Sequence, residues 1–72
     1  MKAKRNENGK IELYLCRDMG NNFVKVSEHD TLNNLRKEGR RLLKAGAYCA
    51  NNFPAREFWY ERADGSGVFE WI

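Results

Sequence analysis

The residues whose types and spacing are best suited to chemistry are cations that recur along residues 36–44. At 100° per residue they fall within an arc of about 140°, on the side of a predicted helix that faces away from its leucines. They are Arg36, Lys37, Arg40, Arg41 and Lys44. Cations gathered in this way can contact phosphates or an acidic protein surface. Lys4 and Arg5, near the N-terminus, are candidates for the same contacts.

The cations of the predicted helix have few acidic neighbours. Only Glu38 interrupts them, and like charges recur four residues apart at positions 36, 40 and 44, which is mildly repulsive. The chain carries a net charge of +3, yet residues 36–55 alone carry +4 and residues 1–17 carry +3. This concentration suggests a partner that relieves the repulsion. An ordinary solvated helix face is the alternative interpretation.

Other residue types that perform catalysis or bind metals occur without partners. His29 is the only histidine, and Cys16 and Cys49 are far apart and form no Cys-x-x-Cys motif. No nucleophile is spaced with a base, and no glycine-rich phosphate loop follows a strand. A chain of 72 residues is also too short for most catalytic architectures. We therefore expect a non-catalytic protein that needs no metal or cofactor.

The sequence also contains no membrane or export signal. No apolar run is long enough to cross a membrane, and residues 1–10 are too polar to form a signal peptide. Two isolated cysteines indicate no disulfide framework. These features predict a cytoplasmic protein without membrane contact.

The first elements that must position these residues are two short strands. Residues 10–17 alternate apolar with more polar side chains, which is the period of a half-buried strand. Turn-forming residues follow, and residues 23–26 predict a second strand. A four-residue turn sets the register of this hairpin. The expected cross-strand pairs are Leu15 with Val24 and Leu13 with Val26.

A single helix is predicted after the first hairpin. Asp30 or Thr31 can cap it, and leucines at a spacing of three or four residues form one apolar stripe. The helix ends near Gly46 or continues toward Asn52. Gly39 lies inside the helix, where glycine costs about 1 kcal/mol relative to alanine. We therefore expect helix and sheet to approach each other closely at Gly39.

The residues from position 56 to the C-terminus predict a second hairpin. Asp64 and Gly65 lie between segments rich in aromatic and β-branched residues, which is the composition of a tight turn. A loop with an even number of residues gathers the aromatic side chains on one face. The expected pairs are therefore Tyr60 with Phe69 and Phe58 with Trp71.

Together these elements predict an α+β fold of the order ββαββ. Two hairpins form one antiparallel sheet, and the helix packs on one of its faces. Residues 1–9 are expected to form a flexible basic arm, and residues 10–72 the single domain. The predicted core comprises Ile11, Leu13, Leu15, Val24, Val26, Leu32, Leu35, Leu42, Leu43, Phe58, Tyr60, Phe69 and Trp71.

The sheet face away from the helix is the second candidate surface. It is expected to expose more apolar side chains than a monomer needs, namely Tyr14, Phe23, Trp59, Val68 and Ile72. Four glutamates on the same face would repel phosphates, so a protein contact or a homodimer fits better than single-stranded RNA. These are Glu12, Glu57, Glu61 and Glu70. Alternatively, residues 1–9 or 47–55 cover part of this face.

The layout of the chain resembles a known class of small proteins. The segment Trp59-Tyr60-Glu61-Arg62-Ala63-Asp64-Gly65, the following Trp71 and a polar-capped helix after a strand pair are similar to the layout of small bacteriophage anti-CRISPR and other anti-defence proteins. The resemblance spans most of residues 10–72 and is one of architecture and size, without a diagnostic motif. It implies a phage-encoded inhibitor in the host cytoplasm that blocks the access of nucleic acid to a host nucleoprotein complex.

The charge and aromatic patterns predict a small non-catalytic protein that binds a partner through the basic helix face and the aromatic sheet face. The resemblance implies that this partner is a host protein or nucleoprotein complex, which the chain inhibits by steric occlusion. Two alternatives remain open. In the first, the chain binds DNA or RNA directly as an accessory protein. In the second, it acts as a homodimeric structural or assembly protein.

Overall fold

The alternating segment of the sequence forms β1 (Ile11–Arg17), the strand around which the sheet is built. β1 pairs antiparallel with both β2 (Asn21–His29) and β3 (Glu57–Glu61). β3 in turn pairs with β4 (Gly67–Glu70), so the strand order is β2-β1-β3-β4. The predicted α+β fold of the order ββαββ is confirmed.

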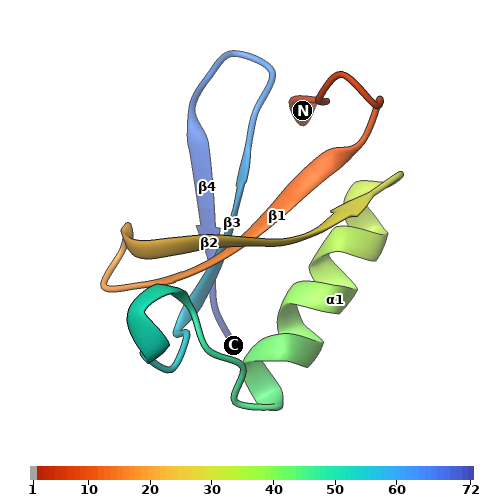
Figure 1. The fold of residues 1–72 in the computed structure, drawn as a ribbon. Coiled ribbons are helices and arrows are strands. Elements are labelled where there is room, and N and C mark those ends of the chain that lie inside the picture. The colour runs from red at the N-terminus through yellow and green to blue at the C-terminus, as the bar shows by residue number, and fades with distance from the viewer. Residues whose placement is uncertain (1) are drawn as a thin grey trace.

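The helix α1 (Leu32–Lys44) begins and ends at the predicted signals, as the computed structural model of residues 2–72 shows (Figure 1). The Thr31 hydroxyl caps the first turn by accepting a hydrogen bond from the Asn34 N–H. At the other end, Gly46 adopts a φ of 75°, and its N–H donates to the Leu43 carbonyl. This Schellman motif stops the helix. Of the two predicted ends, the one near Gly46 is confirmed, and only one 3₁₀ turn, η1 (Ala50–Asn52), follows it before β3.

The contact between helix and sheet is set by Gly39. A Cβ atom at this position would lie 2.5 Å from the ring of Phe58, which is fully buried. Only glycine therefore allows the helix to approach the sheet this closely. The predicted close approach is confirmed. Around this contact, the buried core contains Ile11, Leu13, Leu15, Leu35, Cys49, Phe58 and Tyr60.

The register of the first hairpin is partly as predicted. Leu15 lies opposite Val24, but Leu13 lies opposite Ser27, because an irregularity in the pairing falls between Leu13 and Tyr14. Such a bulge shifts one strand by a residue and turns the following side chains to the other face. Val26, predicted in the core, is consequently 39% exposed.

The predicted register of the second hairpin is wrong by one residue. The loop has five residues, 62–66, and is closed by the Arg62 N–H, which donates to the Ser66 carbonyl. The Asp64 carboxylate accepts the Ser66 N–H inside this loop, an Asx-type turn that an even loop would lack. The observed pairs are Phe58 with Glu70, Trp59 with Phe69 and Tyr60 with Val68.

This one-residue shift exchanges the faces of β4. Val68, predicted on the outer face, packs against the core, while Phe69, predicted in the core, points away from the helix. Trp71, also predicted in the core, is 60% exposed. The even-loop prediction failed because the hydrogen bonds of the Asp64 side chain, and not aromatic pairing, set the loop length.

The sheet is strongly curved. With neighbouring strands about 4.8 Å apart, the two edge strands of a flat four-stranded sheet would lie about 14 Å apart. The ring centroids of Phe23 on β2 and Phe69 on β4 are instead 6.2 Å apart. Figure 1 shows β2 crossing in front of the other strands. The face opposite Leu13, Leu15 and Phe58, called the helix-free face below, is therefore concave.

Residues 2–4, at the start of the predicted flexible arm, lie along the second hairpin. The Lys4 N–H donates to the Glu61 carbonyl at 2.8 Å, and the Ala63 N–H donates to the Lys2 carbonyl at 3.0 Å. Ala3 and Arg62 form an isolated antiparallel bridge. These bonds place the segment against the end of β3, beside the helix-free face.

Candidate interaction surface on the helix-free face

The predicted basic face of α1 is partly neutralised within the chain. Arg36 Nε donates to Glu70 Oε2 at 2.8 Å, and Arg40 Nη2 lies 3.6 Å from Glu70 Oε1. Arg36 also donates to the Tyr60 hydroxyl. Glu70, predicted on the outer face, lies on the helix side because of the one-residue shift in β4. The partner that relieves the repulsion between Arg36 and Arg40 is therefore Glu70 itself.

The remaining helix cations divide into two kinds. Arg41 donates two hydrogen bonds of 2.7 Å to Glu38, within one turn of the helix. Lys37 and Lys44 are exposed, and no ion pair joins either of them to another residue of the 2–72 segment. Five cations thus face two carboxylates, and the excess positive charge of this face is centred on Lys37 and Lys44.

Four aromatic rings meet on the helix-free face, one from each strand. Trp59 is central, with its ring centroid 5.3 Å from both Tyr14 and Phe23 at interplanar angles of 73° and 72°. Phe69 completes the group through its contact with Phe23. We call these four residues the aromatic cluster. Sequence analysis placed Tyr14, Phe23 and Trp59 on this face correctly and missed Phe69.

A glycine holds the central ring of the aromatic cluster in place. A Cβ atom on Gly67 would lie 2.1 Å from Trp59 Nε1, so the indole lies across the bare backbone of β4. Packing of an aromatic ring over a glycine on the neighbouring strand fixes the ring and shields the strand. Edge-to-face contacts with Tyr14 and Phe23 then stabilise the indole further. Phe23 is the most accessible member of the cluster, with 39% of its surface exposed.

The acidic residues expected on this face are arranged differently from the prediction. Glu57 is buried and accepts the Met19 N–H at 2.9 Å, and Glu70 lies on the helix side. Burial, followed by the charge of Glu57, raises the pKa of the Cys16 thiol to about 12. Of the four predicted acids, only Glu12 and Glu61 border the aromatic cluster, and both are paired with lysines.

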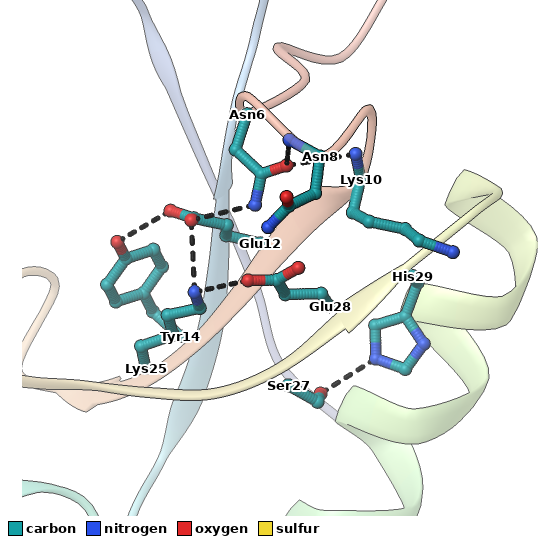
Figure 2. Close-up of polar contacts among 9 residues, drawn as sticks. All are labelled: Asn6, Asn8, Lys10, Glu12, Tyr14, Lys25, Ser27, Glu28 and His29. Atoms are coloured by element: carbon teal, nitrogen blue, oxygen red, sulfur yellow. Dashed lines mark hydrogen bonds and ion pairs between the residues drawn. The ribbon is translucent and has the colours of Figure 1, made fainter.

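Glu12 is the centre of a polar network that includes Tyr14 of the aromatic cluster (Figure 2). Its carboxylate accepts hydrogen bonds from the Asn6 amide at 3.0 Å, the Tyr14 hydroxyl at 3.0 Å and the Lys25 ammonium at 3.1 Å. These bonds lower the pKa of Glu12 to about 2, with Asn6 the largest cause and Lys25 the next. Lys25 also contacts Glu28, so the network connects residue 6 with β1 and β2.

A small pocket opens between this network and the central ring. Its volume is about 190 Å³. The residues that line it come from the N-terminal segment, β1 and β3, and are Lys4, Asn6, Glu12, Tyr14, Trp59 and Glu61. The predicted interface residues Tyr14 and Trp59 therefore form two of its walls, and Lys4, predicted to contact a partner, lies at its edge.

The other predicted site residues lie elsewhere. Arg5 donates to the carbonyls of Gly9 and Asp30, which anchors the N-terminal segment to the start of α1. Ile72 is exposed beside Trp71, and both line a separate hollow with Met19. The basic helix face and the aromatic cluster consequently lie on opposite sides of the sheet and form no single surface.

Comparison of the chain with known protein families, with curated proteins and with solved structures found no match. No helix within residues 2–72 is long and apolar enough to cross a membrane. Interpretation of the site therefore depends on its geometry alone.

Proposed function

We propose that the chain is a small non-catalytic binding protein that inhibits a host nucleoprotein complex by occlusion, with the aromatic cluster as its main protein contact. The observation that carries this proposal is the convergence of four rings on the sheet face that α1 leaves uncovered. Aromatic residues within a charged rim are enriched at protein interfaces, where they contribute a large share of the binding energy.

The ring geometry favours a protein partner. Tyr14 and Phe23 both meet Trp59 nearly edge-on, so the rings pack against one another and do not form a flat stacking platform. A single partner side chain can complete such packing, whereas successive bases of a single-stranded nucleic acid need several ring faces presented side by side. Paired charges from Glu12, Lys25 and Glu61 border the cluster and provide a polar rim.

The opposite side of the molecule has a secondary role in this proposal. Lys37 and Lys44 are exposed cations of α1 that no ion pair among residues 2–72 engages, so both can contact phosphates of a nucleoprotein partner. Arg36 and Arg40 are unsuited to testing that role, because their replacement also breaks the contacts with Glu70. Charge reversal at Lys37 and Lys44 leaves those contacts intact.

Affinity purification from a candidate host, treated with nuclease and quantified by mass spectrometry, tests the proposal. We expect Phe23→Ser to lose the protein that the unmodified chain enriches. Phe53→Ser is the matched control, since Phe53 is exposed to a similar extent on a different segment and should leave capture unchanged. If the serine variant unfolds, Phe23→Leu takes its place, because leucine retains apolar packing but removes the aromatic ring. We then expect reduced capture by the leucine variant. Equal capture by the Phe23 and Phe53 variants would exclude the aromatic cluster.

A second candidate function, direct binding of single-stranded nucleic acid, is favoured by the positions of the acids. Glu57 and Glu70 are withdrawn from the helix-free face, and lysines pair with Glu12 and Glu61, so the expected repulsion of phosphates is weaker. Fluorescence anisotropy with labelled DNA and RNA oligonucleotides tests it. Binding that falls steeply with salt supports this candidate, and absence of binding at low salt excludes it. Sedimentation of the pure protein tests the homodimer alternative.

A further inference from the structure

We propose that the pocket beside Trp59 binds the guanidinium group of an arginine side chain presented by the protein partner. This inference rests on the proposed function and specifies the chemistry of its contact. The pocket volume of about 190 Å³ is smaller than the roughly 300–1,000 Å³ typical of sites for drug-sized ligands. It is therefore suited to one side chain and not to a whole small-molecule cofactor.

Two aromatic rings give the pocket an affinity for cations. Tyr14 and Trp59 stand at 73° to each other with their centroids 5.3 Å apart, so they form two adjoining walls. The faces of such rings carry partial negative charge and attract ammonium and guanidinium groups. Because the Tyr14 hydroxyl donates to Glu12, the phenol is fixed in this position.

Two carboxylates in the same pocket have acceptor capacity to spare. A carboxylate offers about four acceptor positions, and Glu12 uses three of them for Asn6, Tyr14 and Lys25. Among residues 2–72, Glu61 forms one ion pair, with Lys4 at 3.6 Å, and this distance is too long for a good hydrogen bond. Both carboxylate side chains are about one-third exposed, so a ligand can reach them.

The charge of the pocket favours a cation over an anion. Within the part of the chain that the structure describes, Lys4 is the only cation that lines the pocket, against two carboxylates. Lys25, which lies beside the pocket, is shared between Glu12 and Glu28. The Lys4 side chain is 59% exposed and its ammonium lies 3.6 Å from Glu61 Oε1. A cation that donates shorter hydrogen bonds to Glu61 can therefore displace it. The Lys4 ammonium thus occupies part of the position that we assign to the ligand.

The arrangement fits arginine better than lysine. A planar guanidinium can stack on one ring while it donates from its edge to two carboxylates, whereas an ammonium is a compact point charge. The phosphate of a nucleic acid would meet the carboxylates Glu12 and Glu61 here. Binding of arginine at this pocket therefore favours a protein partner over direct binding of nucleic acid.

The direct test is an NMR titration of the intact chain with N-acetyl-arginine amide. We expect shifts of the Trp59 indole N–H and of the Tyr14 ring, and much smaller shifts of the Trp71 indole, which lies outside the pocket. The neutral citrulline analogue, which has nearly the same shape, should cause no comparable change. Equal shifts with citrulline, or no shift with arginine at tens of millimolar, would overturn the proposal.

Two matched variants separate binding from a merely structural effect. Glu61→Gln should weaken arginine binding roughly fivefold, while the same change at the exposed Glu7 should not alter it. Lys4→Gln should strengthen binding roughly twofold to threefold, because it removes the competing ammonium. Unchanged affinity in both the Glu61 and the Lys4 variants would contradict the assignment.

The failure of this inference is distinguishable from failure of the proposed function. If Phe23→Ser abolishes capture of the partner but the arginine probe does not bind, the aromatic cluster is the contact and the pocket assignment is wrong. If the arginine probe binds but Phe23→Ser captures the same proteins, the pocket exists and the proposed contact surface is wrong.

Discussion

The two faces of the sheet differ in how their apolar side chains are covered. On the helix side, Gly39 allows α1 to pack against Phe58. Glu70 forms ion pairs with Arg36 and Arg40 of the same helix. On the helix-free face, curvature of the sheet brings Phe23 to Phe69 around Trp59, and no further element covers these rings completely. The helix side is thus covered by α1 and its charges are paired within the chain, whereas the rings of the helix-free face stay partly exposed.

This difference shows that a charge pattern can be interpreted only when the positions of the acids that pair with it are known. The repeated cations of α1 have the features of a binding surface in the sequence, yet Arg36, Arg40 and Arg41 find their carboxylates within the chain. The helix-free face has a less conspicuous pattern, but it keeps accessible rings and unused acceptors. The variants below test this contrast, starting with the largest expected effect.

Replacement of Gly39 by alanine should be the most damaging single change. Alanine gains helix propensity of about 1 kcal/mol, but its Cβ would overlap the buried Phe58 ring. Because overpacking of a closed core outweighs that gain, we expect the free energy of unfolding to fall by about 2 kcal/mol. Urea denaturation followed by circular dichroism measures it. Asn33→Ala, an exposed helix position, is the control and should be neutral or slightly stabilising. A stabilised Gly39→Ala variant would show that helix and sheet are not in close contact.

Glu70→Gln should have the next largest effect. The Glu70 carboxylate serves two arginines and is only 19% exposed, so its loss should lower the free energy of unfolding by about 1 kcal/mol. Glu38→Gln removes a carboxylate that pairs with one arginine within the same helix, and should cost only about 0.4 kcal/mol. Urea denaturation of both variants side by side tests this order. Equal losses of unfolding free energy would mean that the ion pairs of Glu70 stabilise the fold no more than an exposed pair within one helix.

We expect the acid sensitivity of the helix-free face to be the weakest effect, because the Glu12 and Lys25 side chains are 30% and 39% exposed and solvent screens their contact. Hydrogen bonds from Asn6, Lys25 and Tyr14 lower the pKa of Glu12 from 4.5 to about 2. The stability that Glu12 provides is therefore complete above about pH 4.5 and declines as the pH falls toward 2. The pKa values of Glu28 and Asp30 are also lowered, so the wild type must be compared with Glu12→Gln. We expect the difference in unfolding free energy between the two proteins to shrink across this range. A constant difference would show that Glu12 is not held by the network.

The sequence predicted those parts of the fold that depend on local patterns. Alternation in β1, the Thr31 cap and Gly46 together specify the order of elements, and the internal Gly39 correctly indicated a close packing contact. Each of these features acts over a few residues. They can therefore be recognised without knowledge of the rest of the molecule.

The candidate site was less predictable, because it depends on strand register. A loop of five residues, closed around the Asp64 side chain, moved Phe69 to the helix-free face and Glu70 to the helix side. Odd and even loops differ by one residue but exchange every side chain of the following strand. The pocket could not be predicted from the sequence, since it requires Lys4 to pair with the end of β3 and Asn6 to bond to Glu12 on β1. Gly67 beneath Trp59 was the one signal in the sequence that could have favoured the observed register.

The most direct test of the central claim is a comparison of binding to the captured partner by variants of the two faces. Dissociation constants would be measured for Phe23→Ser and for the double variant Lys37→Glu, Lys44→Glu, each checked for folding by circular dichroism. We predict a loss of at least roughly tenfold for Phe23→Ser, as for an aromatic residue central to an interface, and a smaller, salt-dependent loss for the helix variant. The opposite order, with binding abolished by the helix variant and retained by Phe23→Ser, would contradict the account.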